Sequence, residues 1–146
     1  MSATLPSRVP AVTDWLMTNL PIATGLDPTY VVDGPPTEAN LRTTCIIIGD
    51  VDMDQEWAAL GARNRNEEAI LHLVIYHIGQ GGQTVVNNVA WDLLASIETY
   101  MRVSANVTAG NNVLWMGVVP TTLTKELTDN ARAAWLEVDL KFTARI

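Results

Sequence analysis

A continuous apolar segment, a glycine turn and an amphipathic segment follow one another between residues 68 and 103, and they constrain this chain most strongly. In a strand, successive side chains point to opposite faces. In residues 68–78 most side chains on both faces would be apolar or β-branched, which predicts a central strand covered on both faces. Residues 79–82 (GQGG) end that strand. In residues 84–103 apolar side chains recur at three- and four-residue steps, which predicts a helix packed on the strand.

The amino-terminal half has weaker but readable patterns. Ser7, a proline and helically spaced apolar residues predict a helix over residues 7–20, ending before Pro21. Glycines and prolines then leave room only for a short edge strand at 29–33. Residues 43–51 predict a buried strand, and residues 52–66 read as a long polar connection.

The carboxy-terminal part predicts two more strands. Residues 113–119 form an apolar run that Pro120 is expected to end. Residues 136–146 alternate apolar and polar side chains without a break, as in a half-buried strand. The expected fold is therefore α+β, in one domain over residues 1–146, with a mostly antiparallel sheet of four to five strands and two helices packed on one face. The side chains expected to be buried are Leu93, Ile97, Leu136, Val138, Leu140, Phe142 and Ala144.

The charge of the chain limits its partners. Sixteen acidic residues against nine basic ones give a net charge of −7, which disfavours non-specific binding to nucleic acid or to an anionic membrane. The single cysteine, Cys45, cannot form an intrachain disulfide and lies in an apolar run, as a small core residue would. No apolar run approaches the ~20 residues of a spanning helix, so we expect a soluble, untargeted protein.

Three constellations resemble sites for metal, phosphate or catalysis only in part. Asp50, Asp52 and Asp54 alternate as in a calcium loop, but that motif requires a glycine where Gln55 stands and a glutamate where Gly61 stands. The turn at 79–82 lacks the lysine of a phosphate-binding loop.

His72 and His77 lie five residues apart on one strand, so their side chains are expected on opposite faces, unable to chelate one ion. No serine stands in an activating motif. We therefore expect no catalytic, cofactor-binding or metal-binding residues, and not an enzyme.

Two tryptophans fall on predicted solvent faces. Trp91 lies opposite the apolar face of its helix, and Trp135 begins the outward row of the last strand. Leaving so large an apolar surface in water forgoes a few kcal/mol, which favours a protein contact at these residues. The alternative is that a loop such as 52–66 folds over them.

The order of elements resembles the tail terminator family of long-tailed bacteriophages, over most of the chain from Val9 to Ile146. The local features that carry the resemblance are the amino-terminal helix VPAVTDWLMTNL, Gly34-Pro35-Pro36 after the first short strand, Trp57, the run Arg63-Asn64-Arg65-Asn66-Glu67-Glu68, the glycine turn, Leu93-Leu94 and the closing strand. The resemblance implies a structural virion protein that assembles, usually as a hexameric ring, on the completed tail tube and forms the joining surface for the head-side connector or stopper protein. It implies no catalytic residues.

These implications give specific expectations. The protein would lie in the virion, at the head–tail junction, after assembly in the host cytoplasm, and genomic DNA would pass through the ring without specific binding. The residues expected at subunit or tube contacts are Trp57, Arg63, Arg65, Trp91 and Trp135. The acidic residues expected to face the channel, with a solvated outer loop as the alternative, are Asp50, Asp52, Asp54 and Glu56.

Two other functions remain open from the sequence. The chain could be another head–tail connector or tail completion protein. It could instead be a small ligand-binding or enzymatic α+β domain that uses the turn at 79–82 or the acidic residues at 50–56.

Overall fold

The computed structural model describes residues 7–36, 43–57, 65–128 and 130–145. Its elements follow the predicted order of helix, three strands, helix and two strands, with a short 3₁₀ helix (η1) and a short helix (α3) added. In chain order they are α1 (Val9–Thr24), η1 (Pro28–Tyr30), β1 (Val31–Asp33), β2 (Thr44–Trp57), β3 (Arg65–Gly79), α2 (Gln83–Met101), α3 (Ser104–Val107), β4 (Trp115–Leu127) and β5 (Arg132–Arg145).

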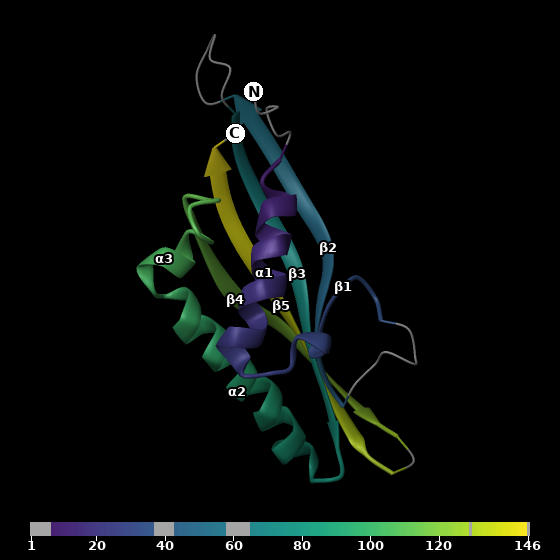
Figure 1. Cartoon of the computed structure of the whole chain (residues 1–146). Helices are drawn as coiled ribbons and strands as arrows, with labels where there is room; N and C mark the ends of the chain where they lie inside the picture. Colours follow the sequence, from purple (N-terminus) through teal and green to yellow (C-terminus); the bar gives the residue numbers. More distant parts are fainter. Residues whose placement is uncertain (1–6, 37–42, 58–64, 129, 146) are drawn as a thin grey trace.

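The strands form one five-stranded sheet in the order β1-β2-β3-β5-β4. The short β1 pairs in parallel with β2, and every other pair is antiparallel. The long ribbons of β2, β3, β5 and β4 dominate the molecule (Figure 1). β3 lies in the middle of this order, as the sequence predicted, and β1 lies at one edge.

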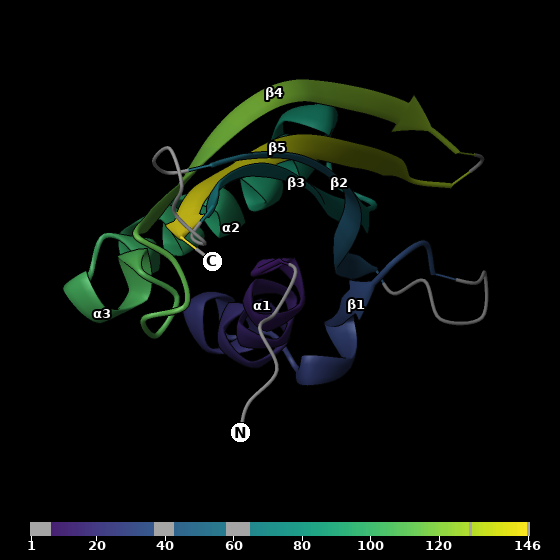
Figure 2. The same ribbon diagram turned by 90° about the horizontal axis from the view of Figure 1, so that it is seen from above.

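Both long helices pack on the same face of the sheet. Leu16 of α1 and Ile97 of α2 join one buried cluster with Leu71 of β3 and Leu140 of β5. Seen from above, the sheet curves around α1 (Figure 2). The predicted fold class is therefore confirmed: a mostly antiparallel sheet with two helices on one face. None of the described helices is long and apolar enough to cross a membrane.

The predicted polar connection at 52–66 is wrong over the residues that the structure describes. β2 continues through Trp57 and pairs residue by residue with β3 back to Arg65, beyond a bulge between Ile48 and Val51. The reason is that polar side chains are tolerated where one side of a strand faces solvent. Asp52 and Asp54 alternate with Val51, which packs against the core.

Pro120 does not end β4, contrary to expectation. The strand runs seven residues further, to Leu127, with a register irregularity between Pro120 and Thr122. β4 is an edge strand, so one side of its backbone has no ladder partner within the sheet. A proline, which lacks an N–H, is tolerated at such an edge or bulge.

The helices differ from prediction at their ends and in phase. α1 does not end before Pro21, as was predicted, but continues through this proline to Thr24. Gly25 caps the helix, because its left-handed φ of +73° lets its N–H donate to the Pro21 carbonyl. Of the two adjacent leucines in α2, Leu94 is buried, while Leu93 is half-buried. Of the side chains predicted to be buried, only Leu93 is not; Ile97 and the five of β5 are at most 1% exposed.

The sequence predicted that β3 is covered on both faces, but the helices cover only one of them. Leu71, Leu73 and Ile75 are buried under the helices, whereas the residues between them lie on the other face, where Glu68 is exposed and Ile70 is half-buried. The apolar run therefore indicated one helix-covered face and one face with an apolar cluster of its own.

Candidate interaction surface on the open face of the sheet

We call the side of the sheet away from α1 and α2 the open face. Strand alternation decides which residues lie on it, because partners in register point to the same side. On β5 and β3 the pairs on this face are Trp135 with Tyr76, Glu137 with Val74, Asp139 with His72, Lys141 with Ile70 and Thr143 with Glu68. The surface thus changes from apolar at one end to charged along the strands.

The apolar end is built around two aromatic rings. Trp135 and Tyr76 contact one another with ring centroids 4.2 Å apart and planes at 45°. The indole Nε1–H of Trp135 donates to Glu126 of β4 at 2.8 Å. Beneath the rings, Cys45 and Ile47 are buried in the same cluster, and burial raises the pKa of the Tyr76 phenol. Trp135 therefore lies on the outward face as predicted, but it does have intrachain partners.

A histidine bridges three strands at the centre of the open face. His72 Nδ1 lies 2.8 Å from Asp139 Oδ1 on β5, and its Nε2 lies 2.9 Å from Asp52 Oδ2 on β2. The hydrogen bond to Asp52, followed by that to Asp139, raises the pKa of His72, although partial desolvation opposes the shift. Only the protonated imidazole carries two N–H groups, so only that form donates to both carboxylates.

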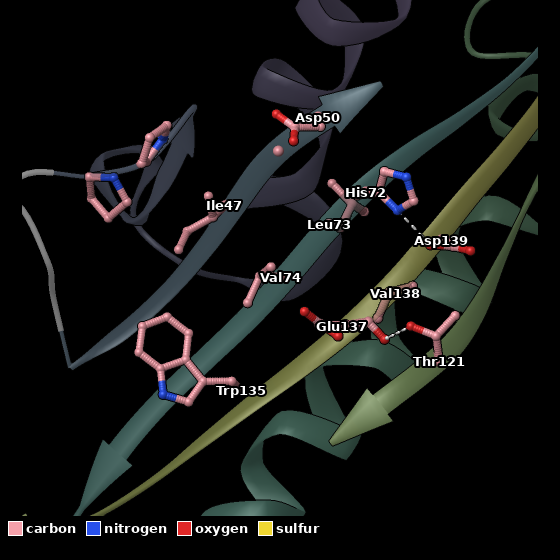
Figure 3. Close-up of a pocket in the computed structure, with 13 residues that line it drawn as sticks. Ile47, Asp50, His72, Leu73, Val74, Thr121, Trp135, Glu137, Val138 and Asp139 are labelled. Carbon is pink, nitrogen blue, oxygen red and sulfur yellow. Dashed lines mark hydrogen bonds and ion pairs between the residues drawn. The ribbon is translucent and has the colours of Figure 1, made fainter. Parts of the chain in front are cut away.

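Next to this bridge a groove with a volume of about 790 Å³ crosses the open face (Figure 3). Trp135 lies at one end, and His72 and Asp139 lie at the other. Ile47 and Val74 provide apolar surface between them. The other residues that line the groove are Pro35, Pro36, Gly49, Asp50, Leu73, Thr121, Glu137 and Val138. The lining holds three carboxylates and, besides the engaged His72, no cationic side chain among the described residues.

A second hollow, of about 450 Å³, lies nearer the end of the β2–β3 hairpin. Asp52, Asp54 and Glu68 line it together with Lys141 and the half-exposed Trp115. The open face is therefore acidic along most of its length.

The structure places the predicted channel residues on a strand. Asp52 and Asp54 are exposed on the open face, and Asp50 lies at the β2 bulge. The segment is extended and paired, so it is not folded as a calcium-binding loop. Glu56 is described only by its backbone in β2. Among the described residues no group of three His, Cys, Asp or Glu side chains is arranged to hold a metal ion.

The predicted contact residues are scattered over the molecule. Trp91 is 41% exposed on α2 and lies across the sheet from Trp135. The backbones of Trp57 and Arg65 pair at the end of the β2–β3 ladder. Arg63 falls outside the described residues.

The glycine turn and the second histidine play local roles. Gly82 precedes the first turn of α2, so the predicted strand-to-helix turn is confirmed. His77 lies on the opposite side of β3 from His72, as predicted, and its Nδ1 is 2.8 Å from Thr44 Oγ1. Burial lowers the pKa of His77.

Sequence reasoning missed two residues that shape this protein. Glu67 is fully buried, and Glu137 projects into the groove. Extending the strand alternation back through residues 65–67 would have placed Glu67 on the buried face. Asking which carboxylates share a face with Trp135 would have found Glu137.

Fold and surface together define an α+β protein with two helices on one face of a curved sheet and an acidic groove on the other. No protein-family model and no curated protein matches the chain. Among solved structures it is similar to a chain of the virion of a native gene transfer agent particle, with 14% identity and a TM-score of 0.43 over 91% of this chain and 92% of that one.

Proposed function

We propose that this protein is a structural subunit of a phage-like tail: a tail terminator that assembles as a ring on the finished tail tube and offers a joining surface to the head-side connector. The features of sequence and element order described above suggest this family. The observation that carries the proposal is the open face itself, a bare sheet surface rich in carboxylates in a chain of net charge −7.

A ring subunit has to meet two demands that such a face satisfies. It needs a surface free of its own helices for contacts with neighbouring copies. It also has to line part of a bore through which DNA can slide. Carboxylates such as Asp52 and Asp54 repel phosphates, so a bore lined by them would not retain DNA. We assign the acidic end of the open face, near the β2–β3 hairpin, to the bore.

The test is to image particles made without this protein. Negative-stain electron microscopy should show tails of uncontrolled length that fail to join heads, and expression of the wild-type chain in the same cells should restore normal particles. A head–tail connector or completion protein would instead leave tails of normal length without heads. Normal, joined tails in the absence of the protein would refute a role in tail completion.

The competing assignment, a small ligand-binding or enzymatic domain, makes a different prediction. Nucleotides or divalent ions should then raise the melting temperature of the purified protein in proportion to the logarithm of ligand concentration. A terminator should show no such shift, and its mass in solution should depend on protein concentration.

A further inference from the structure

Two neighbouring carboxylates in the groove can still accept hydrogen bonds. Glu137 and Asp139 are two residues apart on β5, so both lie on the open face, about 7 Å apart at their Cα atoms. The exposed Glu137 carboxylate makes no hydrogen bond or ion pair within the described part of the chain. Asp139 accepts from His72 through Oδ1, which leaves Oδ2 able to accept from another donor. We call Glu137 and Asp139 the carboxylate pair.

Apolar surface adjoins the carboxylate pair. Ile47 and Val74 line the groove between its two ends, and the Trp135 ring stands at one end (Figure 3). Tyr76 and a hydrogen bond to Glu126 hold that ring in place. A cation can lie over such a ring or beside the aliphatic side chains while it pairs with a carboxylate. The groove therefore suits a surface on which cations stand next to an apolar side chain.

The end of the β4–β5 hairpin is a surface of this kind. Its exposed residues Lys125, Leu127 and Arg132, which we call the arm, lie on the helix side of the sheet, because they alternate with Glu126 and Trp135 of the open face. Leu127 is 71% exposed. The side chains of Lys125 and Arg132 make no hydrogen bond or ion pair within the described residues. In Figure 2 this end of the hairpin stands clear of α1.

The two cations of the arm match the carboxylate pair in spacing. Lys125 pairs with Ala134, which is two residues from Arg132, so the two cations are diagonal neighbours on one face. Such neighbours lie about 7–8 Å apart, close to the spacing of the carboxylate pair. Leu127 pairs with Arg132 and places an apolar side chain directly beside it. Arm and groove are thus complementary in charge, in spacing and in apolar surface.

The other exposed cations that the structure describes have acidic or amide neighbours in their own subunit. Arg102 lies 3.9 Å from a glutamate one turn earlier in α2. Arg145 donates to an asparagine of β3. Lys141 lines the second hollow together with three carboxylates. The arm therefore holds the described cations that are most available to another molecule.

We propose that the groove of one subunit binds the arm of a second copy of this chain, with the two cations on the carboxylate pair and Leu127 against the apolar surface. The arm cannot enter the groove of its own subunit, because the two lie on opposite faces of one sheet. Every subunit therefore both offers an arm and accepts one, and a head-to-tail contact of this kind closes into a ring when its rotation allows. The inference deepens the ring assembly of the proposed function and rests on it.

Two complementary variants test the contact. Glu137→Arg damages the groove and leaves the arm intact, whereas Lys125→Gln with Arg132→Gln damages the arm and leaves the groove intact. By sedimentation velocity each variant alone should self-associate about tenfold more weakly than the wild type. A mixture of the two should form a dimer and nothing larger, because one intact contact remains and cannot propagate.

Matched controls separate this contact from the effect of charge alone. Glu68→Arg makes the same charge change on the open face outside the groove, and Arg102→Gln removes an exposed cation at the carboxyl end of α2. Both controls should self-associate like the wild type. All substituted side chains are exposed, so every variant should keep the melting temperature of the wild type.

A spin label locates the contact in the mixed dimer. A nitroxide on Asn130→Cys of the Glu137→Arg chain lies at the end of the hairpin, next to the arm, and the buried Cys45 stays unlabelled. The label should broaden the amide resonances of Val74 and Ile47 in an isotopically labelled arm variant. An acceptor that also carries Glu137→Arg is the control and should show no broadening.

Several results would overturn the inference: a wild type that stays monomeric, either variant associating at wild-type strength, a mixture that forms no dimer, or groove resonances that do not broaden. Wild-type association of Glu137→Arg combined with loss of tail joining would assign the groove to a basic segment of another protein instead. Rings and normal tails formed by both variants would overturn this contact alone, whereas normal, joined tails without the protein would overturn the proposed function.

Discussion

The Glu67 carboxylate accepts the backbone N–H of Arg8 at 2.8 Å and thereby fastens the start of α1 to the central strand. Gln55 donates to its other oxygen at 2.7 Å from β2. Glu67 is fully buried, and a carboxylate at the first turn of a helix also meets the positive end of the helix dipole. One side chain thus links α1, β2 and β3.

Removing this carboxylate should destabilise the fold. Glu67→Ala leaves a backbone donor and an amide donor without their acceptor, so we expect a loss of about 2 to 4 kcal/mol in urea unfolding. The matched control is Glu68→Ala, one residue along and exposed, which should change the free energy of unfolding by less than ~0.5 kcal/mol. Equal effects of the two substitutions would show that the Arg8–Glu67 contact does not hold the helix.

The phase of α2 can be checked by truncating adjacent leucines. Leu94→Ala should cost about 2 to 5 kcal/mol because it opens a cavity in the core, and Leu140→Ala on β5 should cost a similar amount. Leu93→Ala should cost distinctly less, because Leu93 is only half-buried. A larger loss for Leu93 than for Leu94 in thermal or urea unfolding would support the phase first predicted from sequence.

The two histidines should titrate in opposite directions. Carboxylates raise the pKa of His72, so NMR should place its midpoint above 6.5, while burial should place that of His77 below 6.5. The His72 contribution to stability is fully present below pH 6.5 and is lost as pH rises through the raised pKa. His72→Gln should therefore flatten the loss of stability between pH 6 and pH 8, and an unchanged pH profile would argue against the bridge.

The exposed Trp91 and the packed Trp135 should respond differently to substitution. Trp91→Ala should change the free energy of unfolding by less than ~0.5 kcal/mol, because the side chain is a surface residue. Trp135→Ala removes a ring that packs on Tyr76 and should cost about 1 to 3 kcal/mol. If Trp91 lies at a contact between proteins, Trp91→Glu should weaken assembly while leaving the melting temperature unchanged.

The acidic surface should exclude nucleic acid. At physiological salt the purified protein should show no measurable affinity for duplex DNA in fluorescence anisotropy, because phosphates and the open-face carboxylates repel one another. Replacing Asp52 and Asp54 together by lysine should create weak binding that salt removes. Tight binding by the wild type that persists in high salt would contradict the assignment of this face to a DNA channel.

The sequence by itself determined the elements whose patterns repeat over many residues. The alternation from Leu136 to Ala144 predicted β5 and its buried face, and the helical spacing after residue 84 predicted α2, because one side of each element has to leave water. The pairing of helices with one face of a mostly antiparallel sheet followed from the order of these elements.

Only the tertiary structure decided where the polar residues lie. Asp52 and Asp54 read as a loop because local polarity does not distinguish a solvent-facing strand from a connection, and the β2–β3 register settles the question. Pro120 is compatible with β4 because that strand lies at an edge, a property of the whole sheet. His72, Asp52 and Asp139 come from three strands, so their bridge depends on registers between segments up to 87 residues apart in the chain, which no local pattern encodes.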